Sequence, residues 1–190
     1  MRLPVHERAR QGAAPRLHPS AVVAPGVKLG GDVVVGAFCL VAEGAKVGSG
    51  TRIQSHTSVW AGVTLGEDVF VGPAVVFTNV RRARAAFVRA PHWDETRVED
   101  GATLGAGAVL VCPVRVGSNA LVGAGAVVTS NVAPHAMVAG NPARIIGWAC
   151  TCGERLARGA RRPARCRCGA CGRAFVRGPG GGLRMVTSRS

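Results

Sequence analysis

Large apolar residues recur at every sixth position through the first half of this 190-residue chain. An amphipathic α-helix repeats about every 3.6 residues and a half-buried strand about every two, so the period fits neither element. It is typical of short strands joined by tight turns, in which three hexads form one coil of a triangular prism. The members of the two series are Val23, Leu29, Val35, Val41, Val47, Ile53, Val59, Leu65, Val71 and Phe77, and then Leu104, Leu110, Val116, Val122 and Val128.

Small and β-branched residues follow the same period. Each lies four positions after a large apolar residue, and glycine often comes directly after that residue, as at Gly30, Gly48 and Gly72. We expect the large residue to point into the prism, the small residue to fill a corner, and the glycine to allow close backbone approach or a positive φ. A sandwich of short strands is the alternative, but its turns recur irregularly, about every 8–12 residues. The pattern therefore predicts an all-β fold, a parallel β-helix.

The period is interrupted once. The step from Phe77 to Leu104 is not a multiple of six, so we expect a loop insertion at 81–97, where charged and aromatic residues concentrate.

Charge divides the chain further. Lys and Arg number 24 against 10 Asp and Glu, and ten of the arginines lie after residue 149 together with a single acid, Glu154. A strongly basic surface raises the question of a polyanionic partner, and here that question concerns the C-terminal part. We predict four parts: an N-terminal extension (1–17), the β-helix (18–148), a cysteine-rich module (149–177) and a disordered tail (178–190).

No stretch is uniformly apolar enough for a membrane-spanning helix, and the N-terminus lacks the apolar core of a secretory signal. We therefore expect a cytoplasmic protein without membrane insertion, whose cysteines are reduced.

The seven cysteines form two groups. Cys39 and Cys112 fall within the hexads, and we expect buried core thiols there. The others lie in two Cys-turn-Gly knuckles typical of a zinc ribbon, because tetrahedral Zn²⁺ is held by four thiolates. Cys166 is a spare or substitute ligand. We interpret the module as a cap on the last coil, and the alternative is a module that binds nucleic acid or a partner protein. The preferred zinc ligands are Cys150, Cys152, Cys168 and Cys171.

Several segments between His18 and Trp148 resemble one family, the hexapeptide-repeat acyltransferases. Within it they resemble the N-acetyltransferases that act on UDP-2-acetamido-3-amino-2,3-dideoxyglucuronate and related 3-amino-sugar nucleotides. The resemblance implies a left-handed β-helix, a homotrimer with active sites between neighbouring prisms, and acetyl-CoA as co-substrate. The segments are R-I-Q (52–54), E-D-V-F-V-G-P (67–73), V-F-T-N-V (76–80), G-A-T-L-G-A (101–106), V-G-A-G-A-V-V-T (122–129) and G-N-P-A-R-I-I-G-W (140–148).

The resemblance also implies catalytic residues. Asn79, in the F-T-N segment beside the insertion, is expected to hold the acceptor amine, although an asparagine at a turn can equally satisfy local backbone groups. A sugar amine with a pKa of about 8 is partly neutral at pH 7, so a strong general base is not obligatory. His56 is the candidate base, with a solvated corner residue as the alternative.

Five residues are expected to bind the sugar nucleotide. Trp60 offers a flat apolar wall, and Thr78 is expected to stack over it because the two lie one 18-residue coil apart. Gln54 is a candidate contact to the nucleotide. Arg84 and Arg89 suit a diphosphate or a sugar carboxylate, because guanidinium groups bind such anions bidentately; solvated loop charges are the alternative.

The insertion departs from the family pattern. Arg82 and Ala83 replace Asn-Pro, Ala90 replaces a lysine, and Gly107 replaces an asparagine. We favour a UDP-linked 3-amino sugar, with a dTDP-linked 3-amino-6-deoxyhexose as the alternative. The product would serve synthesis of a cell-surface polysaccharide or a glycosylated metabolite.

Small residues on the second series of coils leave room for the pantetheine arm of acetyl-CoA, and Arg144 would meet a phosphate. A different class of function is a non-catalytic hexapeptide scaffold whose basic module binds nucleic acid or a protein. The residues expected to bind acetyl-CoA are Gly105, Ala106, Gly123, Ala124 and Arg144.

Overall fold

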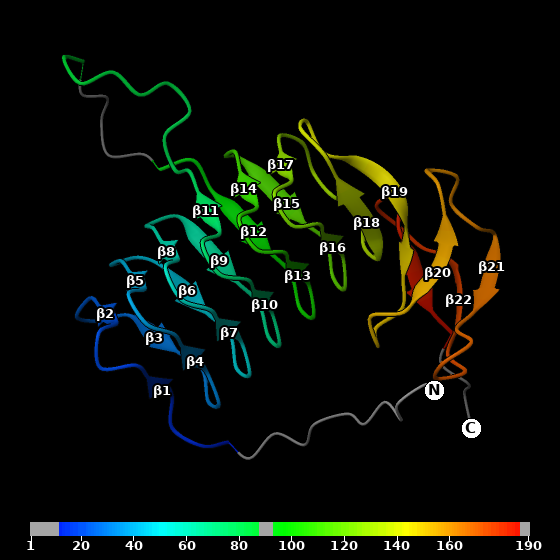
Figure 1. The fold of residues 1–190 in the computed structure, drawn as a ribbon, viewed down its shortest axis with the longest axis horizontal. Helices are drawn as coiled ribbons and strands as arrows, with labels where there is room; N and C mark the ends of the chain where they lie inside the picture. Colours follow the sequence, from blue (N-terminus) through cyan, green and yellow to red (C-terminus); the bar gives the residue numbers. More distant parts are fainter. Residues whose placement is uncertain (1–11, 88–92, 187–190) are drawn as a thin grey trace.

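The computed structural model describes residues 12–87 and 93–186. Within these ranges the chain forms short strands and no α-helix. Most strands are two residues long and belong to three parallel sheets, A, B and C, which form the faces of a prism. Figure 1 shows the coils stacked along the long axis of the molecule. The described part of the chain contains no helix that could span a membrane.

The strands follow one another around the prism in the order A, B, C. Sheet A contains β1 (Arg16–Leu17), β4 (Val34–Val35), β7 (Arg52–Ile53), β10 (Phe70–Val71), β13 (Thr103–Leu104), β16 (Leu121–Val122) and β18 (Ala136–Ala139). Sheet B contains β2 (Val22–Val23), β5 (Leu40–Val41), β8 (Ser58–Val59), β11 (Val76–Phe77), β14 (Val109–Leu110) and β17 (Val127–Val128). Sheet C contains β3 (Lys28–Leu29), β6 (Lys46–Val47), β9 (Val63–Leu65), β12 (Thr96–Val98) and β15 (Val114–Val116).

The pairing register confirms the predicted coil. Val35 pairs with Ile53, which lies 18 residues later, and Val47 pairs with Leu65 at the same interval. The residues of both hexad series point inward and are buried, except Val23 and Leu29, which are partly buried. Those two belong to the first coil, where no described coil covers the core from below.

The sequence pattern assigned close backbone approach and positive φ to the same corner glycine, but in the structure these two properties occur at different corner positions. A Cβ on Gly48 would lie 2.5 Å from the carbonyl carbon of Gly66, so glycine after the inward residue allows coils to approach closely. The left-handed conformation occurs two residues further on, for example at His56 (φ 63°) and Ala74 (φ 55°).

The insertion is bounded differently from the prediction. Val98 pairs with Leu65 although 33 residues separate them, so Val98 belongs to the second hexad series. The described residues between β11 (Val76–Phe77) and β12 are therefore 78–87 and 93–95, and the predicted end at residue 97 is wrong because Thr96–Val98 form β12.

The chain reverses direction after β18. Strand β19 (Arg144–Ala149) pairs antiparallel with β18, and β20 (Arg155–Arg158) pairs antiparallel with β19. Trp148 on β19 is 1% exposed and belongs to the same buried cluster as the prism core. β19 and β20 therefore extend sheet A at the C-terminal end of the prism, and β19 crosses the predicted boundary at residue 148.

A separate antiparallel sheet, D, completes the C-terminal module at the end of the molecule opposite β1 (Figure 1). It consists of β21 (Arg165–Arg167), β22 (Ala174–Arg177) and β23 (Leu183–Met185). Phe175 and Leu183 are buried in the prism's core cluster, and the Leu183 N–H donates to the Pro134 carbonyl at 3.2 Å. The module is therefore packed against the last coil.

Two predicted boundaries need correction. Residues 178–186 were expected to be disordered, but β23 pairs with β22 and buries Leu183, and residues 187–190 lie outside the described part. The predicted extension 1–17 is also too long, because β1 at Arg16–Leu17 already pairs with β4.

Candidate active site and metal centre

The predicted site residues lie on two edges of the prism. We call the turns that join strands of sheet A to strands of sheet B the A–B edge, and those that join B to C the B–C edge. The A–B edge carries Gln54, His56 and the four small residues expected to bind acetyl-CoA. The B–C edge carries Trp60, Thr78 and Asn79, with the insertion directly following.

Close packing explains the small residues of the A–B edge. A Cβ on Gly105 would lie 2.4 Å from the Ala124 nitrogen, so no larger residue fits between these coils. The N–H groups of Gly105 and Gly123 donate to carbonyls of the next coil, Val122 and Val138, at 2.8 Å each. Ala106 and Ala124 are exposed, and within the described ranges their N–H groups have no backbone acceptor. These two amides are therefore the donors that an extended ligand on this edge can use.

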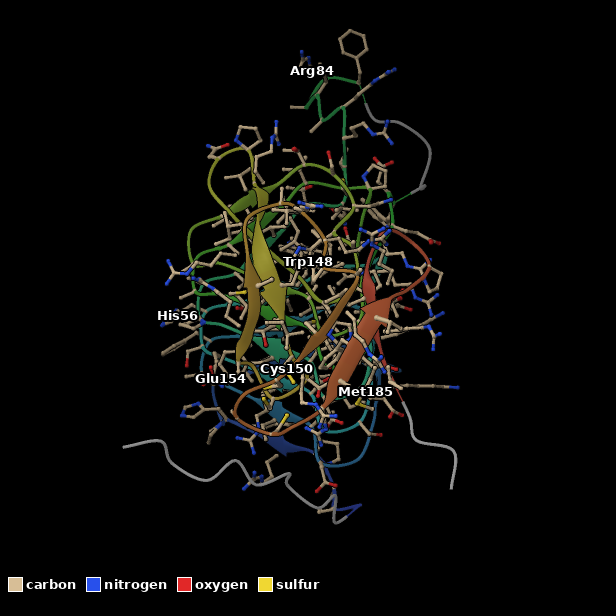
Figure 2. All side chains as sticks on the ribbon, turned by 90° about the vertical axis from the view of Figure 1, so that its right-hand side faces the viewer. His56, Arg84, Trp148, Cys150, Glu154 and Met185 are labelled. Carbon is tan, nitrogen blue, oxygen red and sulfur yellow. The ribbon has the colours of Figure 1, made fainter. Side chains whose placement is uncertain are left out.

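His56 is exposed on the same edge, two coils before Gly105, a separation of about 10 Å at the usual strand spacing. Its ring stacks on Phe38 with centroids 5.1 Å apart. The Gln54 carbonyl accepts a hydrogen bond from the Cys39 thiol at 3.0 Å, and Gln54 is partly buried. Figure 2 looks along the prism and places His56 on its flank.

The B–C edge is organised by hydrogen bonds between coils. The Asn79 side-chain amide donates to the Ala61 carbonyl at 3.4 Å, so Asn79 lies over Ala61 of the preceding coil. The Thr78 hydroxyl accepts from the Cys112 N–H at 2.9 Å, so this predicted substrate contact already has a structural partner.

The base of the insertion closes around Asn79. The Asp94 N–H donates to the Asn79 carbonyl at 3.0 Å, and the Asp94 carboxylate accepts from the Arg81 N–H at 3.0 Å and pairs with its guanidinium at 3.5 Å. Trp93 packs closely against the turn that contains Gly62, since a Cβ on Gly62 would lie 3.0 Å from the Trp93 Cβ. These contacts hold the insertion against the B–C edge.

Two half-exposed indoles consequently lie at the same edge as Asn79. Trp60 is 39% exposed and Trp93 is 49% exposed. Sequence reasoning assigned a role to Trp60 but none to Trp93, because only the folded chain brings Trp93 next to the turn that follows Trp60.

The predicted anion-binding arginines lie apart. Arg84 is exposed at the tip of the insertion, as Figure 2 shows, where its guanidinium donates to the Ala83 carbonyl at 3.1 Å. Arg89 lies outside the described residues. Arg144 follows a turn that bonds to Val127 of β17, so it lies at the C-terminal end of the A–B edge.

One protomer does not unite the predicted site. Sheet B separates His56 and the glycine-rich turns from Asn79 and the two indoles, because the groups occupy opposite edges of that sheet. A groove of about 1170 Å³ lies beside sheet A and the cysteine-rich module, but none of the predicted acetyl-transfer residues lines it.

The structure brings four cysteine sulfurs together. The Sγ atoms of Cys150, Cys152, Cys168 and Cys171 all lie within 4.8 Å of one another, and Cys166 is outside this cluster. The Cys150–Cys171 and Cys152–Cys168 sulfur pairs are 3.5 and 3.7 Å apart. A tetrahedron with Zn–S bonds of about 2.3 Å has edges of about 3.8 Å, so the donor set fits one Zn²⁺ ion. The described cysteines form no disulfide.

Burial raises the pKa of the Cys150 thiol to about 12. A metal ion reverses this preference because a coordinated thiol loses its proton.

Comparison with known proteins agrees with this geometry. Residues 95–130 match the family described as bacterial transferase hexapeptide (six repeats). A dTDP-3-amino-3,6-dideoxy-alpha-D-galactopyranose 3-N-acetyltransferase from Aneurinibacillus thermoaerophilus is 43% identical over 74 residues, which cover 39% of this chain and 38% of the relative. The chain therefore matches well under half the length of this relative.

Solved structures with the same fold include two N-acetyltransferases. The acetyltransferase domain of PglB from Neisseria gonorrhoeae, in complex with acetyl coenzyme A, has a TM-score of 0.61 and 26% identity, covering 70% of this chain and 58% of that one. A mutant GDP-perosamine N-acetyl transferase from Caulobacter crescentus, in complex with CoA and GDP-perosamine, has a TM-score of 0.59 and 30% identity, covering 72% and 58%. The predicted β-helix and the resemblance to sugar-nucleotide N-acetyltransferases are both confirmed.

Proposed function

We propose that this hexapeptide-repeat β-helix is an N-acetyltransferase that moves the acetyl group of acetyl-CoA to the amino group of a nucleotide-linked 3-amino sugar. The observation that carries the proposal is the B–C edge, where the insertion closes on Asn79 and two half-exposed indoles lie at the same edge. The glycine-rich A–B edge supplies a track for an extended co-substrate. The relative's 3-amino-sugar substrate and the CoA bound in the similar structures support the same reaction.

The reaction needs alignment more than strong base catalysis. The amine nitrogen attacks the thioester carbonyl, the C–S bond breaks, and the nitrogen loses a proton as CoA leaves. Asn79 would orient the amine, and an exposed amide N–H of the A–B edge, at Ala106 or Ala124, would donate to the carbonyl oxygen. His56 is the side chain proposed to accept the proton.

A trimer would complete the site. The outward residues of sheet B are mostly aliphatic, and Val22 and Val76 are 61% and 48% exposed. Sheet C instead presents basic residues, including Lys28 and Lys46. If sheet B faces a threefold axis, the A–B edge of one protomer lies beside the B–C edge of the next. Donor and acceptor residues then meet between copies of this chain.

The acceptor edge favours a neutral sugar. The Arg81 guanidinium is paired with Asp94, and Arg84 lies at the tip of the insertion, so neither is available beside Asn79 for a sugar carboxylate. Trp60 and Trp93 instead offer apolar surface to a pyranose ring. We therefore place a dTDP-linked 3-amino-6-deoxyhexose ahead of the UDP-linked uronate.

Release of CoA, followed with a thiol reagent across dTDP- and UDP-linked 3-amino sugars, tests the proposal. Asn79→Ala is expected to lower kcat/KM by about 10²–10³, in the range for loss of one positioned hydrogen-bonding group. His56→Ala is expected to lower kcat, because the proposed proton acceptor is lost, whereas His18→Ala, on the same edge but further from Gly105, should have no effect. Absence of CoA release with every acceptor would overturn the proposal.

We also propose that the four-cysteine cluster binds one structural Zn²⁺. Cys150 follows Ala149, whose N–H donates to the His135 carbonyl at 2.8 Å in the last coil, and Cys168 is buried in the same cluster as Trp148. When bound, the metal would cross-link the two knuckles and hold the module across the end of the prism.

Metal content and tryptophan fluorescence test this role. The wild-type protein and Cys166→Ser are expected to contain one zinc per chain, and Cys168→Ser should contain much less. Chelation should shift the emission of buried Trp148 to longer wavelength in the wild type. Cys39→Ser is the matched control, because Cys39 is a buried thiol outside the cluster. An equal zinc content in Cys168→Ser would contradict the proposed ligand set.

A further inference from the structure

The C-terminal module carries many more arginines than acidic residues. The sequence after residue 149 contains ten arginines and one acid, Glu154. Within the described residues, two of the arginines donate to backbone carbonyls, Arg162 to Gly178 and Gly182, and Arg167 to Gly172. Six further arginines are exposed and form no ion pair with another described residue. They are Arg155, Arg158, Arg161, Arg165, Arg177 and Arg184.

The register of sheet D gathers several of these side chains on one face. Arg165 of β21 pairs with Val176 of β22, which pairs with Arg184 of β23. Directly paired residues project to the same side of a sheet, and residues two apart on a strand do so too, so Arg167 shares this face. Residues of the other face include Phe175, which is fully buried in the core. The arginine face therefore points away from the prism.

Among the described residues, one aliphatic side chain, and no aromatic one, is exposed on the arginine face. Val186 is 37% exposed, comes two residues after Arg184, and donates its N–H at 2.8 Å to the carbonyl of Ala174, which pairs with Arg167. Met185 pairs with Phe175 and lies on the opposite face. The sequence after residue 149 contains no Trp, Tyr, His, Asn or Gln. The module thus lacks the rings on which single-stranded bases stack and the amides that read adenine. A face of guanidinium groups with one exposed valine and no such rings or amides matches the phosphate region of an anionic lipid headgroup layer.

The module also lies where a flat surface can reach it. It forms the C-terminal end of the molecule in Figure 1, and Figure 2 faces that end. From these observations we infer that the arginine face of sheet D docks the protein peripherally on an anionic phospholipid membrane. In the proposed trimer, three such faces lie at one end, so a membrane plane contacts all three while a nucleic-acid duplex does not. The inference rests on the proposed trimer for this multivalency, and it is independent of acetyl transfer.

The expected effect is large enough to measure. Each arginine near an anionic lipid surface strengthens binding by about fivefold, and linked copies multiply the effect. The interaction should weaken as salt rises, because the Debye length shortens from about 10 Å at 0.1 M to about 3 Å at 1 M.

Vesicle co-sedimentation of the zinc-loaded full-length protein tests the inference. The probes are vesicles of phosphatidylcholine alone and of phosphatidylcholine with one quarter phosphatidylglycerol. We expect binding to the second type only, with at least a tenfold loss for Arg165→Gln combined with Arg184→Gln. Lys28→Gln combined with Lys46→Gln removes the same charge from sheet C and should leave binding unchanged. Arg165→Lys combined with Arg184→Lys keeps the charge and should retain most binding.

Zinc content and CoA release are measured on each variant, and both should match the wild type because neither arginine belongs to the proposed site. Equal binding to neutral and anionic vesicles would overturn the inference, and so would equal losses in the arginine and lysine variants. Tighter, arginine-dependent binding to duplex DNA than to vesicles would also overturn it, by assigning the face to nucleic acid. Absence of CoA release by the wild-type protein would contradict the proposed enzyme function but not the membrane-docking inference.

Discussion

Two buried threonine hydroxyl groups inside the prism differ in their hydrogen bonding. Thr51 and Thr96 are both fully buried, two residues before an inward-pointing apolar residue. The Thr51 hydroxyl donates to the Gly66 carbonyl at 2.8 Å and accepts from the Val69 N–H at 3.0 Å. The Thr96 hydroxyl has no hydrogen-bond partner. Because an unpaired buried polar group costs free energy, these two threonines should contribute oppositely to stability.

Replacement of each threonine by valine tests this contrast. Thr51→Val should lower the free energy of unfolding by about 1–3 kcal/mol, since it leaves the Gly66 carbonyl and the Val69 N–H without this partner. Thr96→Val should leave stability unchanged or raise it, because it removes the unpaired hydroxyl at nearly constant volume. Urea unfolding at one protein concentration measures both. A similar destabilisation by the two substitutions would contradict the argument.

His135 joins the last coil to the module. It is 4% exposed, its Nδ1–H donates to the Ala149 carbonyl at 3.0 Å, and its ring meets Phe175 edge-on at 5.1 Å. Burial lowers the pKa of His135 below its usual 6.5, so the folded protein favours the neutral ring more than the unfolded chain does. The unfolded chain therefore binds a proton at this residue before the folded chain does as the pH falls.

Stability is accordingly expected to fall as the pH drops from above 6.5 to the lowered pKa of folded His135. His135→Asn should remove this component, and asparagine tolerates the positive φ of 63° and retains an amide donor for Ala149. Thermal unfolding between about pH 5 and 8 measures the difference. If the two proteins show the same pH dependence in this window, His135 is not the group responsible.

At the scale of the element, the spacing between coils depends on the backbone at the corners. Gly105 faces the Ala124 nitrogen so closely that a methyl group would lie 2.4 Å from it, whereas Gly125, with φ 66°, has open space around it. Both glycines lie on the A–B edge, but one is required by contact and the other by conformation.

Gly105→Ala is therefore expected to separate two coils, lower the melting temperature strongly and raise the KM for acetyl-CoA. Gly125→Ala should cost about 1–2 kcal/mol of stability, the strain of a left-handed alanine, with little change in KM. Differential scanning fluorimetry and steady-state kinetics compare the two variants. A smaller loss for Gly105→Ala than for Gly125→Ala would contradict the packing explanation.

At the scale of the whole molecule, the prism presents faces of different character. Sheet B is largely aliphatic on its outside, and sheet C is basic. Val34 on sheet A and Val76 on sheet B occupy the same outward position of a two-residue strand, but only Val76 belongs to the face proposed to lie at the trimer axis.

Val76→Glu is expected to dissociate the trimer, because it places three carboxylates at an apolar axis. Val34→Glu introduces the same charge on sheet A and should leave the trimer intact. Size-exclusion chromatography with light scattering measures the molar mass. CoA release should fall with the trimer, since the two edges of the site then no longer meet. A trimeric Val76→Glu protein would contradict the proposed interface.

The amino-acid sequence alone predicts the prism, because a six-residue period repeated along the chain reports a local rule that each coil obeys. It also predicted which four cysteines gather, since two tight knuckles leave few alternatives for their sulfurs. The start of β12 was missed because Thr96–Val98 directly follows the insertion, although Val98 lies six residues before Leu104 and so keeps the hexad period.

Folding in three dimensions sets which residues share an edge of the prism and which are exposed to water. It placed Trp93 beside the turn of Trp60, moved Arg84 away from Asn79, and ordered residues 178–186 against the last coil. These outcomes depend on contacts between residues far apart in the sequence. A local sequence pattern does not report the energies of such contacts. The separation of His56 from Asn79 has the same origin, because the closure of three sheets into one prism assigns each turn to an edge.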